Sequence, residues 1–236
     1  MNIVVVSPPM LRTPPESYGG MELMAFNLVK AMSDRGHHVD LLARHDSFTP
    51  PNGFLFAYED ESDLQRLVDN NAVLWAADVW IDFSHNKTLW INDPDRPIIR
   101  NFQVMSLMGN GINPVFISHG QKAGKFQGVD GPVIYYGLDL DEYPLYTGPR
   151  DNYLLYLGQM IPEKRIEWAC EVAKRTGRPL KAYGPWWTPP DYAEFLREYE
   201  RQYPDLISLN DSVGGQEKIE LLQHAYALIH PPGAMG

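Results

Sequence analysis

The chain has 236 residues, of which 44% are hydrophobic and 21% charged, so it can form one large domain or two small ones with packed cores. Its net charge of −10 argues against a broadly basic face for nucleic acid or an anionic membrane, so any phosphate site must be local. Cys170 is the single cysteine, and no Cys/His cluster has zinc spacing, so we expect neither an internal disulfide nor a metal centre. The apolar run at residues 3–6 is too short for a signal peptide or a membrane span, which makes the cytoplasm the default compartment.

Strand-like and helix-like segments alternate along the chain, which predicts an α/β fold with parallel sheets and crossover helices. In the first predicted helix, Met24, Leu28 and Met32 share one apolar face, and Gly36 is placed to end it in a left-handed conformation. Cys170 lies in a similar apolar stripe, which favours an inert core thiol. The predicted strands are 2–7, 38–43, 54–58, 78–83, 97–102, 114–118, 132–136, 152–158, 179–183, 206–210 and 226–230, and the predicted helices are 20–33, 61–71, 119–126, 164–176, 190–202 and 215–224.

A boundary is predicted within residues 137–151, because this stretch is rich in turn residues and has no helical or strand period. We therefore expect an N-terminal domain over 1–145 and a C-terminal domain over 146–236. The second domain has few elements, and the sequence stops directly after a strand of the buried type, so we expect that domain to be incomplete.

Two glycines, Gly19 and Gly20, stand at the start of the first predicted helix, after a buried strand and a long loop. A helix start presents free backbone N–H groups to an anion, and glycine lets a ligand approach the main chain closely. The spacing is not Gly-x-Gly-x-x-Gly, so a dinucleotide site is not indicated. The alternative is an ordinary strand–helix connection in which glycine serves packing.

A second candidate loop follows the predicted strand at 152–158, where Gly158-Gln159-Met160-Ile161-Pro162-Glu163-Lys164-Arg165 leads into a helix. Proline and an acid suit a helix start, whereas a cation there is unfavourable unless an anion is near. Lys164 therefore points to a phosphate site. The alternative is a surface lysine that forms a solvated pair with Glu163.

These two loops resemble those of the retaining GT-B glycosyltransferases of family 4. That family shares a Pro-Pro…Tyr-Gly-Gly-x-Glu loop, an Arg-Gly-His turn and a Gly-Arg-x-x-x-x-Lys motif. The resemblance implies two Rossmann-like doubly wound parallel-sheet domains, the second truncated here, and a nucleotide-diphosphate sugar as donor substrate with no other cofactor and no metal. It implies that Lys164 grips the donor diphosphate. Gln159 replaces the family's arginine, so either the grip is weaker or Arg165 supplies the missing charge.

Further candidate residues are marked by the resemblance or by their position at the end of a predicted strand or the start of a predicted helix. His85, at a strand end, matches a family histidine near the transferred sugar, with a structural loop histidine as an equally weighted alternative. Glu22 either contacts a ligand hydroxyl or is a helix-start acid favoured by the dipole, and the second reading is preferred. Val213 is placed to contact the nucleotide base through its backbone. Trp186 and Trp187 either stack on a sugar or base or pack against the following helix, and packing is the more common outcome.

The implied function is metal-independent transfer of a sugar, with retention, from a nucleotide-diphosphate donor to a hydroxyl acceptor. The expected partners are the nucleotide-sugar and the acceptor, without nucleic acid and without a transmembrane segment. The family's donor-ribose glutamate would fall beyond Gly236. The alternative is therefore a non-catalytic nucleotide-sugar-binding remnant, or a subunit completed by a C-terminal segment or a second chain.

Overall fold

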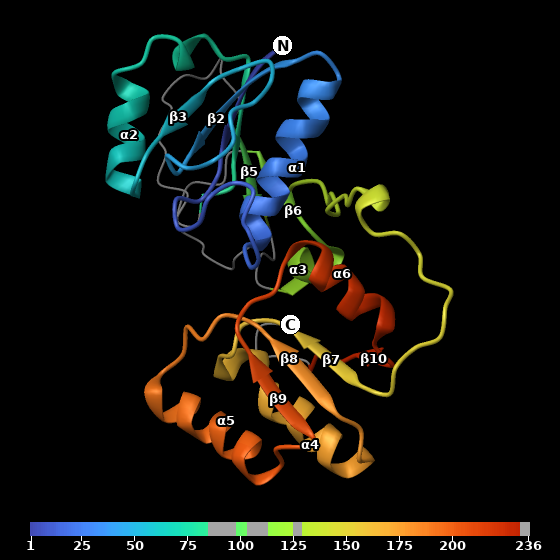
Figure 1. The fold of residues 1–236 in the computed structure, drawn as a ribbon. Coiled ribbons are helices and arrows are strands. Elements are labelled where there is room, and N and C mark those ends of the chain that lie inside the picture. Colours follow the sequence, from blue (N-terminus) through green and yellow to red (C-terminus); the bar gives the residue numbers. More distant parts are fainter. Residues whose placement is uncertain (85–97, 103–112, 125–128, 232–236) are drawn as a thin grey trace. The chain divides into compact units, whose positions relative to one another are not determined.

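The computed structural model describes residues 1–84, 98–102, 113–124 and 129–231, and the chain forms two compact units. Unit 1 comprises Met1–Pro15 and Gly19–Asp139, and unit 2 comprises Leu140–Gly236 with the short segment Glu16–Tyr18. Each unit has its own parallel sheet (Figure 1). The predicted α/β fold class is confirmed.

The sheet of unit 1 has six strands in the order β3-β2-β1-β4-β5-β6, all parallel. In the central strand, Val4 pairs with Asp40 on one side and with Trp80 on the other. The strands are β1 (Asn2–Val6), β2 (His38–Ala43), β3 (Leu55–Ala57), β4 (Val79–Asp82), β5 (Ile98–Phe102) and β6 (Pro114–Phe116).

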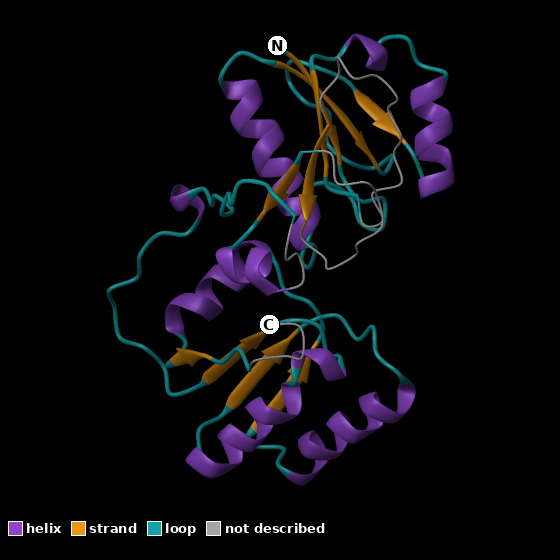
Figure 2. Cartoon of the chain, turned by 180° about the vertical axis from the view of Figure 1, so that it is seen from behind, coloured by secondary structure: helices purple, strands orange, loops and turns teal. Residues whose placement is uncertain are grey.

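Helices cover both faces of this sheet, because successive side chains of a strand point to opposite sides. Val5 packs in one core with Ala25 of α1 (Gly20–Asp34), whereas Val4 packs in another with Leu64 of α2 (Glu61–Asp69). Figure 2 shows these two helices flanking the strands. The described part of unit 1 also has a 3₁₀ turn at Leu74–Ala76 and the short helix α3 (His119–Gly124).

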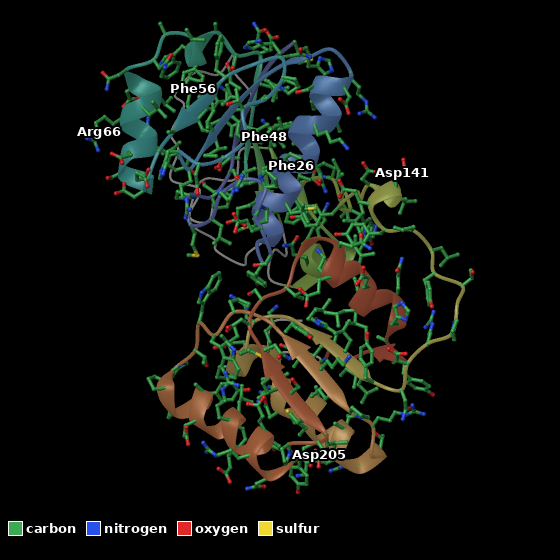
Figure 3. All side chains as sticks on the ribbon, viewed as in Figure 1. Phe26, Phe48, Phe56, Arg66, Asp141 and Asp205 are labelled. Carbon is green, nitrogen blue, oxygen red and sulfur yellow. The ribbon has the colours of Figure 1, made fainter. Side chains whose placement is uncertain are left out.

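Local chemistry sets the helix ends in unit 1. The Asp60 carboxylate caps α2 by accepting hydrogen bonds from the backbone N–H groups of Ser62 and Asp63. After α1, Gly36 adopts a φ of 82°, the left-handed conformation predicted for it. Phe26 of α1 meets Phe48 edge to face, with ring centroids 4.8 Å apart (Figure 3).

Unit 2 has four parallel strands in the order β10-β7-β8-β9. One core joins the sheet to α4 and α5, and contains Cys170 and Leu196; another lies on the sheet with Leu221 of α6. The strands are β7 (Leu154–Leu157), β8 (Leu180–Tyr183), β9 (Ile207–Asn210) and β10 (Ala227–Leu228), and the helices are α4 (Ile166–Thr176), α5 (Pro190–Gln202) and α6 (Gly215–His224).

The predicted strand at 132–136 was wrong, because this segment makes only a single bridge, between Val133 and Phe116. Ile134 and Tyr135 are 57% and 64% exposed, so no apolar pairing holds them in the sheet. The segment instead ends at Asp139, whose carboxylate accepts a hydrogen bond from Lys30 at 2.9 Å.

The turn-rich stretch after Asp139 contains a 3₁₀ turn, Leu140–Glu142, in which Asp141 is exposed (Figure 3). Residues within 143–151 then accept hydrogen bonds from side chains of α6. The Lys218 ammonium donates to the Tyr143 hydroxyl at 3.2 Å, and the Gln223 amide donates to the Pro144 carbonyl at 3.0 Å. Among the helices that the structure describes, none combines the length and apolar character needed to cross a membrane.

Candidate functional site

The loops after β7 and β8 in unit 2 are joined by backbone hydrogen bonds. Gly158 N–H donates to the Tyr183 carbonyl and Met160 N–H donates to the Pro185 carbonyl, both at 3.0 Å. A Cβ on Gly184 would lie 1.7 Å from the Gly158 carbonyl oxygen, so only glycine fits this close approach. The carboxyl edge of this sheet is therefore tightly built, and it is the edge at which open α/β sheets bind ligands.

Lys164 closes a 3₁₀ turn, Pro162–Lys164, that precedes α4. The predicted helix start at 164 is thus corrected to Ile166, because Arg165 adopts a left-handed φ of 53° between the two elements. Lys164 is half-buried, and among the described residues its ammonium has neither an ion pair nor a hydrogen bond. The expected alternative pair with Glu163 is not present in this structure.

The other two candidates in this loop differ in their surroundings. The Gln159 backbone carbonyl accepts a hydrogen bond from the Tyr156 hydroxyl at 2.9 Å, while its side-chain amide is unpaired within the described part of unit 2. The Arg165 guanidinium lies 3.7 Å from the Glu167 carboxylate and 5.7 Å from the Trp168 ring centre. Arg165 is therefore engaged by α4, which leaves Lys164 as the uncompensated cation of this loop.

The loop after β9 carries Val213. Asn210, at the strand end, donates from its amide to the Ala182 carbonyl at 3.2 Å and so ties β9 to β8. Asp211 and Ser212 follow, and their side chains make no hydrogen bond or ion pair with any described residue. Val213 is partly exposed in the same loop.

Gly19, Gly20 and Glu22 lie at the carboxyl end of β1 in unit 1. Gly19 is the N-cap of α1 with a φ of 148°, and the cap position makes no side-chain hydrogen bond. A Cβ on Gly19 would lie 2.7 Å from Pro15, whereas one on Gly20 would meet nothing within 4 Å. Gly20 therefore leaves room for a ligand, and Gly19 is required by the backbone.

Glu22 is 4% exposed, and burial raises the pKa of its carboxyl above the ordinary value of 4.5. Its Oε2 would lie 3.1 Å from a Cβ on Gly19, so the carboxyl packs against the glycine loop. The candidate His85 lies outside the described residues. Burial raises the pKa of the Cys170 thiol to about 12, as expected for an inert core cysteine.

Sequence reasoning missed a buried polar group at the carboxyl ends of β1 and β4. The hydroxyls of Ser7 and Thr13 lie 2.7 Å apart, and the Ser84 N–H donates to the Asp82 carboxylate at 2.8 Å. All four residues are fully buried. The available signal was that each strand ends in a short polar residue directly after an apolar run.

Unit 1 also has an elongated groove of about 630 Å³ along α1, from Met24 to Arg35. Its other wall includes Ile81 and the segment 134–139. The lining is mainly apolar, and the Lys30 ammonium at its border is already paired with Asp139. Within the described residues, no group of three or more His, Cys, Asp or Glu side chains is placed to hold a metal ion.

No family model and no curated protein matches the chain. Among solved structures it is similar to AviGT4, a glycosyltransferase of avilamycin A biosynthesis, with a TM-score of 0.80 and 24% identity over 100% of this chain and 74% of that chain. A glycosyltransferase from Rickettsia africae gives a TM-score of 0.67 and 16% identity, covering 97% of this chain and 72% of that chain. Anabaena HepE, solved with UDP and glucose, gives 0.64 and 15%, covering 98% and 74%. These similarities establish the fold, a GT-B arrangement of Rossmann-like parallel-sheet domains.

Proposed function

We propose that this chain is a glycosyltransferase that moves a sugar from a nucleoside diphosphate donor to a hydroxyl acceptor. The observation that carries the proposal is Lys164, a half-buried cation without a partner among the described residues, at the ligand-binding edge of the unit 2 sheet. Because no acidic side chain of the described residues neutralises it, this ammonium is available to an anion that binds at the edge. The fold neighbour HepE was solved with UDP and glucose, and Arabidopsis starch synthase IV with ADP and acarbose, which supports a nucleotide donor.

In this proposal unit 2 binds the donor and unit 1 serves the acceptor. When the bond to the sugar breaks, negative charge develops on the diphosphate leaving group. The Lys164 ammonium and the unpaired amide of Gln159 stabilise that charge without a metal ion. Gly19 and Gly20 supply backbone N–H donors to a ligand from unit 1. We propose that transfer proceeds with retention at the anomeric carbon and without a dedicated protein nucleophile.

The test is calorimetric titration with UDP, GDP and ADP of the wild type, Lys164→Ala and Lys174→Ala. Losing one charge-assisted contact costs about 1.5–3 kcal/mol, which is roughly ten- to a hundred-fold in affinity. Lys174 is the matched control, because it lies on α4 and is already paired with Glu171 at 2.7 Å. We expect weaker binding only for Lys164→Ala, with partial recovery in Lys164→Arg.

An activity measurement accompanies the titration, namely release of the nucleoside diphosphate from a panel of nucleotide-sugars. Lys164→Ala should lower this release, and Lys174→Ala should not. Equal binding and release by Lys164→Ala and the wild type would refute the phosphate assignment. A wild type that binds none of the three diphosphates would refute the donor class.

A further inference from the structure

One peptide group in the loop after β7 is hydrogen-bonded on both sides. This group joins Gln159 to Met160. Its carbonyl oxygen accepts a hydrogen bond from the Tyr156 hydroxyl at 2.9 Å, and its N–H donates to the Pro185 carbonyl at 3.0 Å. Because a peptide group is planar and its C=O and N–H point in opposite directions, these two bonds fix the orientation of the whole plane.

Rotation of this plane would break both hydrogen bonds. In the turned-over peptide, the carbonyl oxygen of Gln159 would face the carbonyl oxygen of Pro185, so two acceptors would meet without a donor. Tyr156 is 1% exposed, and burial raises the pKa of its hydroxyl, so this group keeps its proton and remains a donor. The tyrosine side of the peptide is thus held by a donor that lies in the core of unit 2.

The locked peptide determines how the chain enters the loop that carries Lys164. Met160 and Ile166 are both fully buried, and they belong to the same core as Tyr156. The segment between these two anchors is short and contains the 3₁₀ turn Pro162–Lys164. The position of the Lys164 backbone therefore depends on the direction in which the chain leaves Met160.

We propose that Tyr156 is a positioning residue that preorganises the diphosphate loop by holding the Gln159–Met160 peptide. It acts through the side chains of Gln159 and Lys164, whose donor groups have to be in place before charge develops on the leaving diphosphate. Without the hydroxyl, the Gln159 carbonyl loses its donor and the loop samples other orientations, so ordering it costs part of the binding free energy. This inference rests on the proposed function, since it concerns a diphosphate held by Lys164.

Tyr153 is the matched control, because it lies just before the other end of β7. Its hydroxyl donates to the Leu221 carbonyl at 2.8 Å, its side chain is 5% exposed, and burial raises its pKa as well. Tyr153→Phe and Tyr156→Phe therefore each remove one hydroxyl and one hydrogen bond to a backbone carbonyl, while the ring stays in the core. Both variants should lose a similar amount of stability, and only Tyr156→Phe should change the loop after β7.

Amide hydrogen exchange measures the lock without any ligand. In the wild type, the Met160 amide should exchange more slowly than the Gln159 amide, which makes no backbone hydrogen bond within the described residues. Tyr156→Phe should speed exchange at Met160 by roughly 2- to 13-fold relative to Tyr153→Phe, the factor that corresponds to one neutral hydrogen bond. Equal exchange at Met160 in the two variants would overturn the inference, as would a wild type in which Met160 exchanges as fast as Gln159.

Calorimetric titrations with UDP, GDP, ADP and inorganic pyrophosphate then test whether the lock serves the ligand. Tyr156→Phe should bind the nucleoside diphosphates and pyrophosphate roughly 2- to 13-fold more weakly, and Tyr153→Phe should bind them like the wild type. In turnover of nucleotide-sugars, the loss should fall mainly on kcat rather than KM, because the leaving diphosphate carries more charge in the transition state than in the bound donor. Equal affinities and equal kcat in the two variants would overturn the positioning role.

The outcomes separate this inference from the proposed function. If Lys164→Ala weakens diphosphate binding while Tyr156→Phe and Tyr153→Phe bind equally, the phosphate assignment stands and the positioning role fails. A wild type that binds no diphosphate refutes both. Melting temperatures establish that the variants are folded, and the wild-type comparison of Met160 with Gln159 can overturn the lock without any variant.

Discussion

Gly184→Ala tests the close approach of the β7 and β8 loops. The new methyl group would lie 1.7 Å from the carbonyl oxygen of Gly158 and 2.6 Å from its carbonyl carbon. Both atoms belong to the main chain, so no side-chain rotation relieves the collision. One loop has to move, and the hydrogen bond from Met160 N–H to the Pro185 carbonyl is the first contact to lengthen.

The magnitude follows from two contributions. Overpacking a well-packed region costs typically about 1–3 kcal/mol, and a lost backbone hydrogen bond adds about 1 kcal/mol. We therefore expect a loss of about 2–4 kcal/mol in the free energy of unfolding of unit 2. For a domain of about 100 residues, each kcal/mol lowers the melting temperature by roughly 4–8 °C, so the shift should be at least about 8 °C.

Scanning calorimetry and urea unfolding measure this effect, with two further glycine variants as a graded control. Gly158→Ala should be milder, because the nearest atom to its Cβ would be the Tyr156 hydroxyl at 3.0 Å, against 1.7 Å for the nearest atom at Gly184. Gly124→Ala has no neighbour within 4 Å and should change stability by less than about 1 kcal/mol. A Gly184→Ala protein as stable as the Gly124→Ala protein would refute the reasoning.

Two further predictions concern buried titratable groups. Because burial raises the pKa of Glu22 above 4.5, the unfolded state releases its proton first, and the native state loses stability as the pH rises through the raised pKa. Glu22→Gln should therefore melt above the wild type at pH 7 and together with it at about pH 3.5, and a gap that is the same at both pH values would contradict this. The Cys170 thiol, with its pKa raised to about 12, should react with Ellman's reagent only in denaturant, and rapid labelling of the native protein would show that the core opens readily.

The element order could be predicted from the sequence because both sheets are parallel and largely buried. A strand such as β1 has Val4 to Val6 buried on both faces, which gives a short apolar run, and the helices between the strands show a clear period. The Lys164 loop was singled out because a cation next to Pro162 conflicts with an ordinary helix start, although the structure places Lys164 at the end of a 3₁₀ turn and begins the helix at Ile166. Local sequence patterns therefore marked the loop on which the proposed function rests.

The rest depends on contacts that local patterns do not contain. Periodicity could not separate Trp186 from Trp187, because their burial is decided by Arg197, Tyr18 and the end of β8. Arg165 has a left-handed φ, which the sequence does not indicate for a non-glycine residue, and its guanidinium pairs with Glu167. The assignment of Glu16–Tyr18 to unit 2 is likewise a property of the folded chain.

The strand order of unit 2 also constrains how this unit is assembled during synthesis. Strand β7 lies between β8, which follows it closely in the chain, and β10, which is made only after three helices. Until β10 leaves the ribosome, the carbonyl groups of Tyr153 and Leu155 lack the N–H donors of Tyr226 and Ile229. At roughly 5–20 residues per second this interval lasts several seconds. During that time the nascent unit exposes a central strand edge, which is a template for pairing with other chains.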